Sequence, residues 1–286
     1  MKKSLLLLMV WTAAASFAIG QRRMTVRDQE SIRRTLDFAT GAGSKVLEVD
    51  NVQGSIRVTG YDGSTVEMIV NKTIRAESQD RLNLARQEVR LDIQDRQNTI
   101  NIFVEQPGHE RSTDNSSRSR WSDRGYEVSF NFEFRVPRQT AVRLRTINDG
   151  DIRVEGVAGD FEVNNINGGI EMRAISGSGR AHTINGGVQV MFRDNPRGNS
   201  HFGSLNGNIE VAFQQNLSAD LRFKTLNGGV YTDFPVSSSP VTLNAGQRSD
   251  GRLVFKNEFS QARIGNGGPT MEFDGFNGDI RIVQVK

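Results

Sequence analysis

The sequence predicts an all-β protein of the β-solenoid type, a single-stranded β-helix in which repeats of roughly 20 residues stack on one another. Three observations predict this class. An Asn-Gly turn signal recurs through the second half of the chain, and apolar residues recur at fixed offsets from it. The 286 residues also include 29 glycines but only 6 prolines, as repeated tight turns require. Such a repeat cannot bury its apolar face alone, so several copies must stack.

The first 20 residues have the composition of a signal peptide. Lys2 and Lys3 precede an uncharged apolar run over 4–19, which ends in small residues suited to cleavage. The run is shorter than the roughly 20 residues that cross a bilayer, and no later segment is apolar enough to do so. We therefore expect an exported protein in the periplasm, on the cell surface or outside the cell, with a linker over 21–40. An uncleaved N-terminal anchor is the alternative.

Composition narrows the classes of partner. The chain has 36 basic and 33 acidic residues, and loss of Lys2 and Lys3 leaves 34 against 33. A nearly neutral mature chain argues against nucleic acid as a partner, so charge can act only through local patterning. The absence of cysteine excludes disulfides, thiolate metal sites and lipid-modified cysteine.

The repeat is defined by its turn asparagines, which are Asn148, Asn167, Asn185, Asn206, Asn227 and Asn277. Each follows a large apolar residue, in the order Ile147, Ile166, Ile184, Leu205, Leu226 and Phe276. Further apolar columns lie four residues before each Asn and three and five residues after it; the first copy has one extra residue, so its equivalents after the Asn are Ile152 and Val154. This pattern predicts two short strands, each with one buried face, joined by a turn of positive φ that Asn and Gly tolerate.

Asn-Gly between alternating strands also indicates a β-hairpin, so an antiparallel β meander or sandwich is the alternative fold. In a solenoid, equivalent residues of successive repeats stack directly, about 4.8 Å apart, which favours similar residues in each column. Strands of a meander alternate with other strands, and their columns need not match. The uniform columns favour the solenoid.

Residues 41–138 form an N-terminal β-rich part, and residues 139–286 form the repeat part; the two are either separate or one continuous domain. A seventh copy of the repeat lies at 47–58, with Gln53 in the Asn position. Around it we expect one helix that covers a sheet edge or a solenoid end, a mobile polar loop and four strands. The helix is expected over Ser78–Glu88, the loop over 107–125, and the strands over 64–75, 89–93, 99–104 and 126–136.

No pattern of catalytic residues is present in the sequence. None of the three histidines has the spacing of a metal site or of a nucleophile's base, and no glycine motif precedes a helix as a phosphate loop would. The paired Asp149 and Asp151 are typical of a turn rather than of a calcium site. We therefore expect no enzyme activity, metal or cofactor. A polysaccharide-acting β-helix enzyme is the alternative, although Glu162, Glu171 and Glu210 are scattered over three repeats.

Three segments carry a resemblance to a known family: Val49-Asp-Asn-Val-Gln-Gly-Ser-Ile-Arg-Val-Thr-Gly60, the Thr-Ile-Asn-Gly-Gly repeat and the Phe-Asn-Gly-Asp-Ile-Arg-Ile repeat. Over residues 41–286 the chain resembles the bacterial putative-adhesin family, which is built on a domain of unknown function with repeated β-strands. The resemblance implies an exported, non-enzymatic, solenoid-like domain, and it supplies no catalytic residues. Gln53 and the 50-residue gap between Asn227 and Asn277 depart from the simple repeat.

We expect an adhesin or binding scaffold of the cell envelope, or a secreted one, that uses the outer faces of the solenoid. The expected partner is a surface glycan or an envelope protein; a structural envelope protein that binds another protein is a further alternative. Basic residues recur two apart in alternate repeats, so one outer face is a candidate site for an anionic ligand. Its residues are Arg143, Arg145, Arg180, Arg222 and Lys224.

Overall fold

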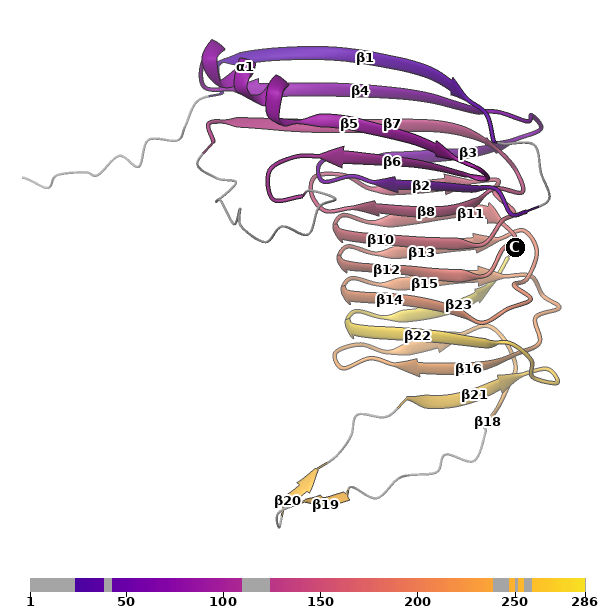
Figure 1. The fold of residues 1–286 in the computed structure, drawn as a ribbon. Coiled ribbons are helices and arrows are strands. Elements are labelled where there is room, and N and C mark those ends of the chain that lie inside the picture. The colour runs from indigo at the N-terminus through magenta and orange to yellow at the C-terminus, as the bar shows by residue number, and fades with distance from the viewer. Residues whose placement is uncertain are drawn as a thin grey trace, which may run out of the picture.

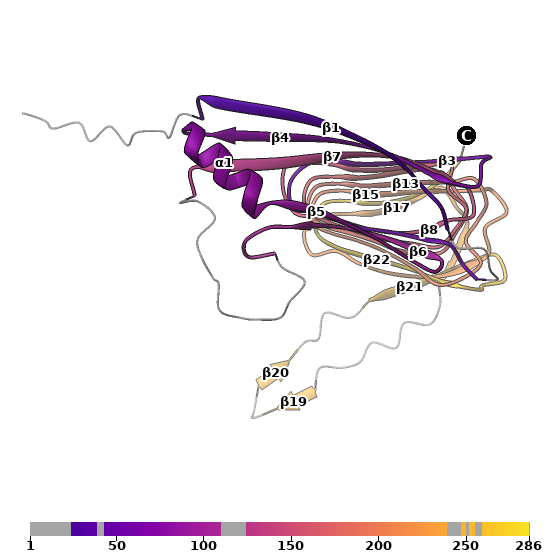
Figure 2. The ribbon, with the colours of Figure 1, turned by 45° about the horizontal axis from the view of Figure 1, so that its top comes forward.

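The computed structural model describes residues 24–38, 43–109, 124–238, 247–249, 252–254 and 259–285. The predicted signal peptide and most of the predicted loop over 107–125 lie outside these residues. Two large β-sheets lie face to face with the apolar core between them, and one short helix lies at the N-terminal end of the stack (Figures 1 and 2). The prediction of an all-β protein with one helix is confirmed.

The ten-stranded sheet contains, in spatial order, β1 (Val26–Leu36), β4 (Val66–Ala76), β7 (Tyr126–Pro137), β3 (Ile56–Tyr61), β9 (Ile152–Glu155), β11 (Ile170–Ile175), β13 (Val188–Phe192), β15 (Ile209–Phe213), β23 (Ile280–Gln284) and β17 (Val230–Thr232). The eleven-stranded sheet contains β18 (Val236–Ser238), β21 (Ser260–Ile264), β16 (Ala219–Lys224), β22 (Thr270–Asn277), β14 (Ser200–Asn206), β12 (Gly179–Asn185), β10 (Phe161–Asn167), β8 (Ala141–Thr146), β2 (Val46–Asp50), β6 (Thr99–Glu105) and β5 (Arg90–Arg96). A separate two-stranded sheet contains β19 (Gln247–Ser249) and β20 (Arg252–Val254).

Each repeat contributes one strand to each large sheet. The strand before the Asn-Gly turn lies in the eleven-stranded sheet and the strand after it lies in the ten-stranded sheet, as β10 and β11 do. The turn therefore crosses from one sheet to the other and does not form a hairpin. Equivalent strands of neighbouring repeats pair in parallel, with Asn167 opposite Asn185 and Asn185 opposite Asn206. The meander alternative expects antiparallel pairing of these strands.

The order of stacking departs from the order of the chain. The C-terminal repeat, β22–β23, lies between β14–β15 and β16–β17, so Asn277 lies opposite Asn206 and bridges to Asn227 on its other side. Within the 50-residue gap of the sequence pattern, the chain adds β18 and β21 to the end of the eleven-stranded sheet and then returns to place β22 between β14 and β16. Beyond β16, the antiparallel strand β21 extends the eleven-stranded sheet.

The core confirms most of the predicted buried columns and corrects one of them. Inward side chains stack directly, and the rings of Phe202 and Phe273 have centroids 5.5 Å apart. The apolar residue before each Asn, however, points out of the eleven-stranded sheet, and Leu226 is 54% exposed. Because strand residues alternate between faces, the residue two before the Asn points inward instead, as the buried Thr183 and Ser204 do.

The turns have the predicted positive φ at glycine and not at asparagine. Among the described residues, none of the six turn asparagines has a positive φ. In the first turn, the residue with a positive φ is Asp149. The glycines after Asn185, Asn206 and Asn277 have φ of 159°, 155° and 143°, and close approach between neighbouring turns favours glycine as well. A Cβ on Gly186 would lie 2.3 Å from the carbonyl oxygen of Gly168 in the preceding repeat, and one on Gly207 would lie 2.1 Å from that of Gly186.

The N-terminal part continues the same stack. Leu47 and Val49 of β2 lie opposite Val142 and Leu144, and Gln53 bridges in parallel to Asn148, so the predicted seventh copy joins the repeats. The antiparallel strands β1, β4 and β7 then extend the ten-stranded sheet. The predicted linker over 21–40 is wrong where β1 forms, because every residue of β1 pairs with β4.

The helix α1 (Gln79–Glu88) forms where the sequence predicts it. The side chain of Ser78 caps its first turn by accepting a hydrogen bond from the Arg81 amide at 3.3 Å. Leu82 and Ala85 are buried, and the helix packs against β1, β4 and β7. It lies beside the end of these three strands (Figure 2).

Candidate functional site

Parallel pairing arranges the outward side chains of the eleven-stranded sheet in straight columns. Along β8, β10, β12, β14, β22 and β16, the first column contains Arg143, Glu162, Arg180, His201, Glu272 and Arg222. The second column, two residues further along each strand, contains Arg145, Asn164, His182, Gly203, Asp274 and Lys224. We call this surface the cation face. All five basic residues predicted as an anionic-ligand face lie on it.

Carboxylates lie between most of these basic residues, which the sequence pattern did not predict. Arg222 pairs with Glu272 at 3.1 Å, and Lys224 pairs with Asp274 at 3.3 Å. These acids belong to the inserted strand β22, so they become neighbours of β16 only through the altered stacking order. The ring of Phe259 lies beside both cations, 4.9 Å from the Arg222 guanidinium and 4.7 Å from the Lys224 ammonium. Arg145 pairs with Asp50 of β2 at 3.6 Å.

Arg143 and Arg180 remain without an ion pair to any carboxylate of the described residues. Glu162 lies opposite both in the parallel register, one strand away from each. Arg180 also lines a shallow hollow of about 520 Å³ across β10, β12, β14, β22 and β16. Its polar lining includes Glu162, Arg180, Asn199, His201, Arg222 and Glu272. The hollow thus exposes one unpaired guanidinium beside a mixed set of polar groups.

Two half-buried histidines adjoin Arg180 on the cation face. Burial lowers the pKa of His182 below 6.5, and the charge of Arg180 lowers it further. Burial and Arg180 likewise lower the pKa of His201, whereas Glu272, which contacts its Nδ1 at 3.1 Å, opposes the shift. Both rings are therefore uncharged at neutral pH, and acidification adds positive charge beside Arg180.

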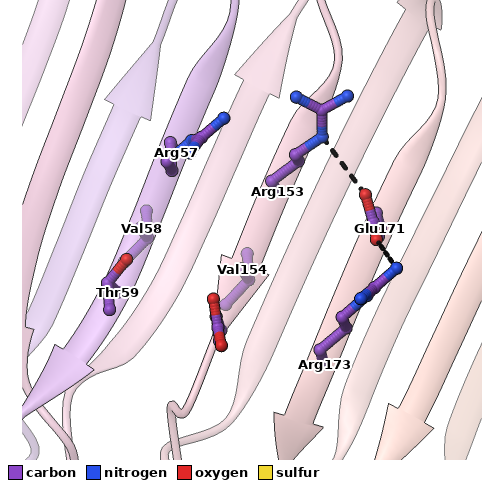
Figure 3. Close-up of a pocket in the computed structure, with 8 residues that line it drawn as sticks. Arg57, Val58, Thr59, Arg153, Val154, Glu171 and Arg173 are labelled. Atoms are coloured by element: carbon purple, nitrogen blue, oxygen red, sulfur yellow. Dashed lines mark hydrogen bonds and ion pairs between the residues drawn. The ribbon is translucent and has the colours of Figure 1, made fainter.

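The outer face of the ten-stranded sheet has a smaller hollow of about 200 Å³ over β3, β9 and β11. Figure 3 shows Glu171 between two arginines, with Arg153 Nε 3.2 Å from one carboxylate oxygen and Arg173 contacting the other. Arg57 lies in the same row, opposite Arg153 in the parallel register. This hollow is mainly an ion-pair network and was not predicted from the sequence.

The six turn asparagines, predicted only as turn formers, build a continuous ladder of side-chain hydrogen bonds. In the order Asn227, Asn277, Asn206, Asn185, Asn167 and Asn148, the Nδ2 of each of the first five donates to the Oδ1 of the next at 2.7–2.8 Å. The amides lie exposed along the turn edge of the stack, except for the half-buried Asn148. The sequence signal for this ladder is that Asn occupies all six turn positions and Asp occupies none, because an amide both donates and accepts hydrogen bonds whereas a carboxylate only accepts them.

The described residues contain no group of three or more His, Asp or Glu side chains placed to hold a metal ion. Their one helix has 10 residues, so none of their helices can cross a bilayer.

No family model and no curated protein matches the chain. Among solved structures it is similar to a "putative cell adhesion protein" from Clostridium sporogenes, at 9% identity and a TM-score of 0.45 over 90% of this chain and all of that one. A "putative adhesin" from Parabacteroides merdae matches at 9% identity and a TM-score of 0.24, over 91% of this chain and 97% of that one. A "putative lipid binding protein" from Parabacteroides distasonis matches at 10% identity and a TM-score of 0.26, over 90% of this chain and 97% of that one.

Proposed function

We propose that the protein is an exported, non-enzymatic binding scaffold of the adhesin kind, built as a β-solenoid that presents flat outer faces to a polymer. The parallel, in-register stacking of the repeats carries this proposal. It places equivalent outer side chains at a constant spacing of about 4.8 Å, which suits a ligand that is itself a repeating chain. Export rests on the signal-peptide composition of residues 1–20.

The ligand proposed for the cation face is an acidic surface glycan. Arg143 and Arg180 support it, because a guanidinium without a carboxylate partner is free to bind a ligand carboxylate through two parallel hydrogen bonds. The other three basic residues already form ion pairs: Arg145 with Asp50, Arg222 with Glu272, and Lys224 with Asp274. Their proposed role is to stabilise the arrangement of the cation face, whereas Arg143 and Arg180 make the first contacts with the glycan.

An affinity gel containing alginate, a polyuronate, tests this assignment. The Arg143→Ala/Arg180→Ala variant is expected to lose most of the retardation that wild-type protein shows, and the salt dependence of binding should weaken with it. A matched control, Arg33→Ala/Arg34→Ala, removes the same charge from exposed positions of β1. Equal loss in both variants would assign the effect to net charge, and unchanged retardation in the first would reject the cation face.

We propose no catalytic activity for this protein. Glycoside hydrolases need a protonated acid placed across the bond from a second carboxylate. In the hollow of Figure 3, Glu171 is bridged by Arg153 and Arg173, which occupy both of its carboxylate oxygens. A screen against acidic and neutral glycans, with and without calcium, tests the enzyme alternative; new reducing ends or unsaturated products would replace the scaffold proposal.

A further inference from the structure

The turn edge of the stack is a second surface, distinct from the cation face. It consists of the asparagine ladder and the apolar column immediately before it. That column contains, in stacking order, Ile147, Ile166, Ile184, Leu205, Phe276 and Leu226. In Figure 1 the edge runs down the left side of the repeats, where the strands of the eleven-stranded sheet end. The first three apolar side chains are half-buried, whereas Leu205, Phe276 and Leu226 are 43%, 43% and 54% exposed.

This edge is almost free of charge. From the apolar residue to the second residue after each Asn, the described turns contain Asp149 and Asp279 as their only charged side chains. The chain as a whole is 24% charged, and the adjacent cation face has a charged residue at most positions. An acidic glycan would gain no ion pair here, so the edge suits an uncharged ligand.

The ladder leaves hydrogen-bonding capacity on exposed side chains of the turn edge. A primary amide has two N–H donors and a carbonyl oxygen with two lone pairs. Within the ladder, Asn185 uses one N–H toward Asn167 and one lone pair for Asn206. Each interior Asn therefore keeps one donor and one acceptor at a constant spacing. Hydroxyl groups, which both donate and accept, are the complementary chemistry.

The dimensions of the edge favour a narrow ligand over a second copy of this chain. Six stacked turns span about 24 Å, and the two columns are about 7 Å wide, so the strip covers on the order of 200 Å². A stable protein–protein interface buries roughly 800 Å² on each partner. A single extended polymer chain matches this strip in width, and a pyranose ring in an extended glycan is close in length to one strand spacing.

We propose that the turn edge binds a neutral, extended polysaccharide lying along the stack. Its hydroxyls bond to the free amide donors and acceptors of the ladder, and its apolar ring faces pack on Leu205, Phe276 and Leu226. This proposal is independent of the acidic ligand of the cation face, because it uses other residues and a different chemistry.

Affinity electrophoresis in hydroxyethyl cellulose, a neutral β-linked glucan, tests the proposal. Wild-type protein is expected to be retarded, and Phe276→Ser/Leu226→Ser to bind at least about tenfold more weakly, since two apolar contacts are lost. Met191→Ser is the matched control, because Met191 is 45% exposed on the outer face of the ten-stranded sheet. It should behave as wild type. If the double variant does not fold, Leu226→Ser alone is used as the edge variant in the same binding test.

Three results would overturn the proposal: no retardation of wild type, an edge variant that binds as well as wild type, or equal loss in Met191→Ser. Sedimentation velocity adds a fourth, since a wild-type dimer that the edge variant dissociates would make the edge a self-interface. The Arg143→Ala/Arg180→Ala variant separates the two surfaces. It should keep hydroxyethyl cellulose binding while losing alginate binding, so either proposal can fail while the other stands.

Discussion

Asn185 shows how one side chain connects three repeats. Its amide donates to Asn167 and accepts from Asn206, both at 2.8 Å, while its backbone ends the strand β12. The sequence predicted the position of Asn185 in a turn but not its partners, because the register of neighbouring repeats is a tertiary property. Asn227, at the end of the ladder, makes one such bond, to Asn277.

Asn185→Ala is therefore expected to destabilise the protein more than Asn227→Ala. The first removes two side-chain hydrogen bonds of about 1 kcal/mol each, and the second removes one. Urea unfolding of both variants measures the difference. Equal changes in the free energy of unfolding would show that the ladder contributes little and that Asn is retained for the turn alone.

Adjacent glycines in one turn should respond very differently to alanine. A Cβ on Gly186 would lie 2.3 Å from a backbone oxygen, whereas one on Gly187 would have its nearest neighbour at 3.4 Å. We expect Gly186→Ala to lower the free energy of unfolding by about 2 kcal/mol or more, because neither backbone can move without disturbing the stack. Gly187→Ala should cost well under half of that. The reverse order in urea unfolding would contradict the close stacking of the turns.

The lowered pKa values of His182 and His201 make stability depend on pH. The unfolded chain binds protons at these residues near pH 6.5, while the folded protein takes them up only at lower pH. Protons therefore favour the unfolded state, and stability should fall as pH drops from about 7 through 6.5 toward the folded-state pKa values. Thermal unfolding of wild type and of His182→Gln/His201→Gln at pH 7.5 and 5.5 measures this. The variant should show the smaller decrease; an equal decrease would assign the effect to other groups.

At the scale of elements, the sequence predicted most strands and the helix, but not their neighbours. The alternation of residues located β4, β5, β6 and β7 closely, and Ser78 marked the start of α1. Periodicity in the chain, however, does not show which repeat stacks on which. The C-terminal repeat inserts between two earlier ones, and no local pattern in β22 or β23 records that place. For the same reason the pairing of Arg222 with Glu272 could not be foreseen.

Two phenylalanines of β22 test its central position. Phe273 is fully buried and packs on Phe202, whereas Phe276 is 43% exposed on the turn edge. Phe273→Ala should destabilise the protein by about 3 kcal/mol or more, since the inserted strand cannot close the cavity without moving both neighbours. Phe276→Ala should change the free energy of unfolding by about 0.5 kcal/mol or less. Similar costs in chemical unfolding would mean that β22 is not held between two other strands.

At the scale of the whole molecule, stacking converts a weak repeat into two straight surfaces with different chemistry. The cation face combines paired and unpaired basic residues, and the turn edge combines amides with exposed apolar side chains. The sequence placed the five basic residues on one face correctly but assigned the apolar column of the edge to the core. That error has a physical cause, because apolar composition alone does not show to which face a residue at a strand end points.

The most direct test of the central claim, parallel stacking with the C-terminal repeat inserted, is disulfide formation between pairs of introduced cysteines. The chain contains no cysteine of its own. Leu205 and Phe276 lie on neighbouring strands in register, about 4.8 Å apart, which is within disulfide reach. Leu205 and Leu226 are two strands apart, at about twice that distance. Oxidation should crosslink Leu205→Cys/Phe276→Cys within one chain and leave Leu205→Cys/Leu226→Cys reduced. The opposite result would show that the repeats stack in chain order and would contradict the account.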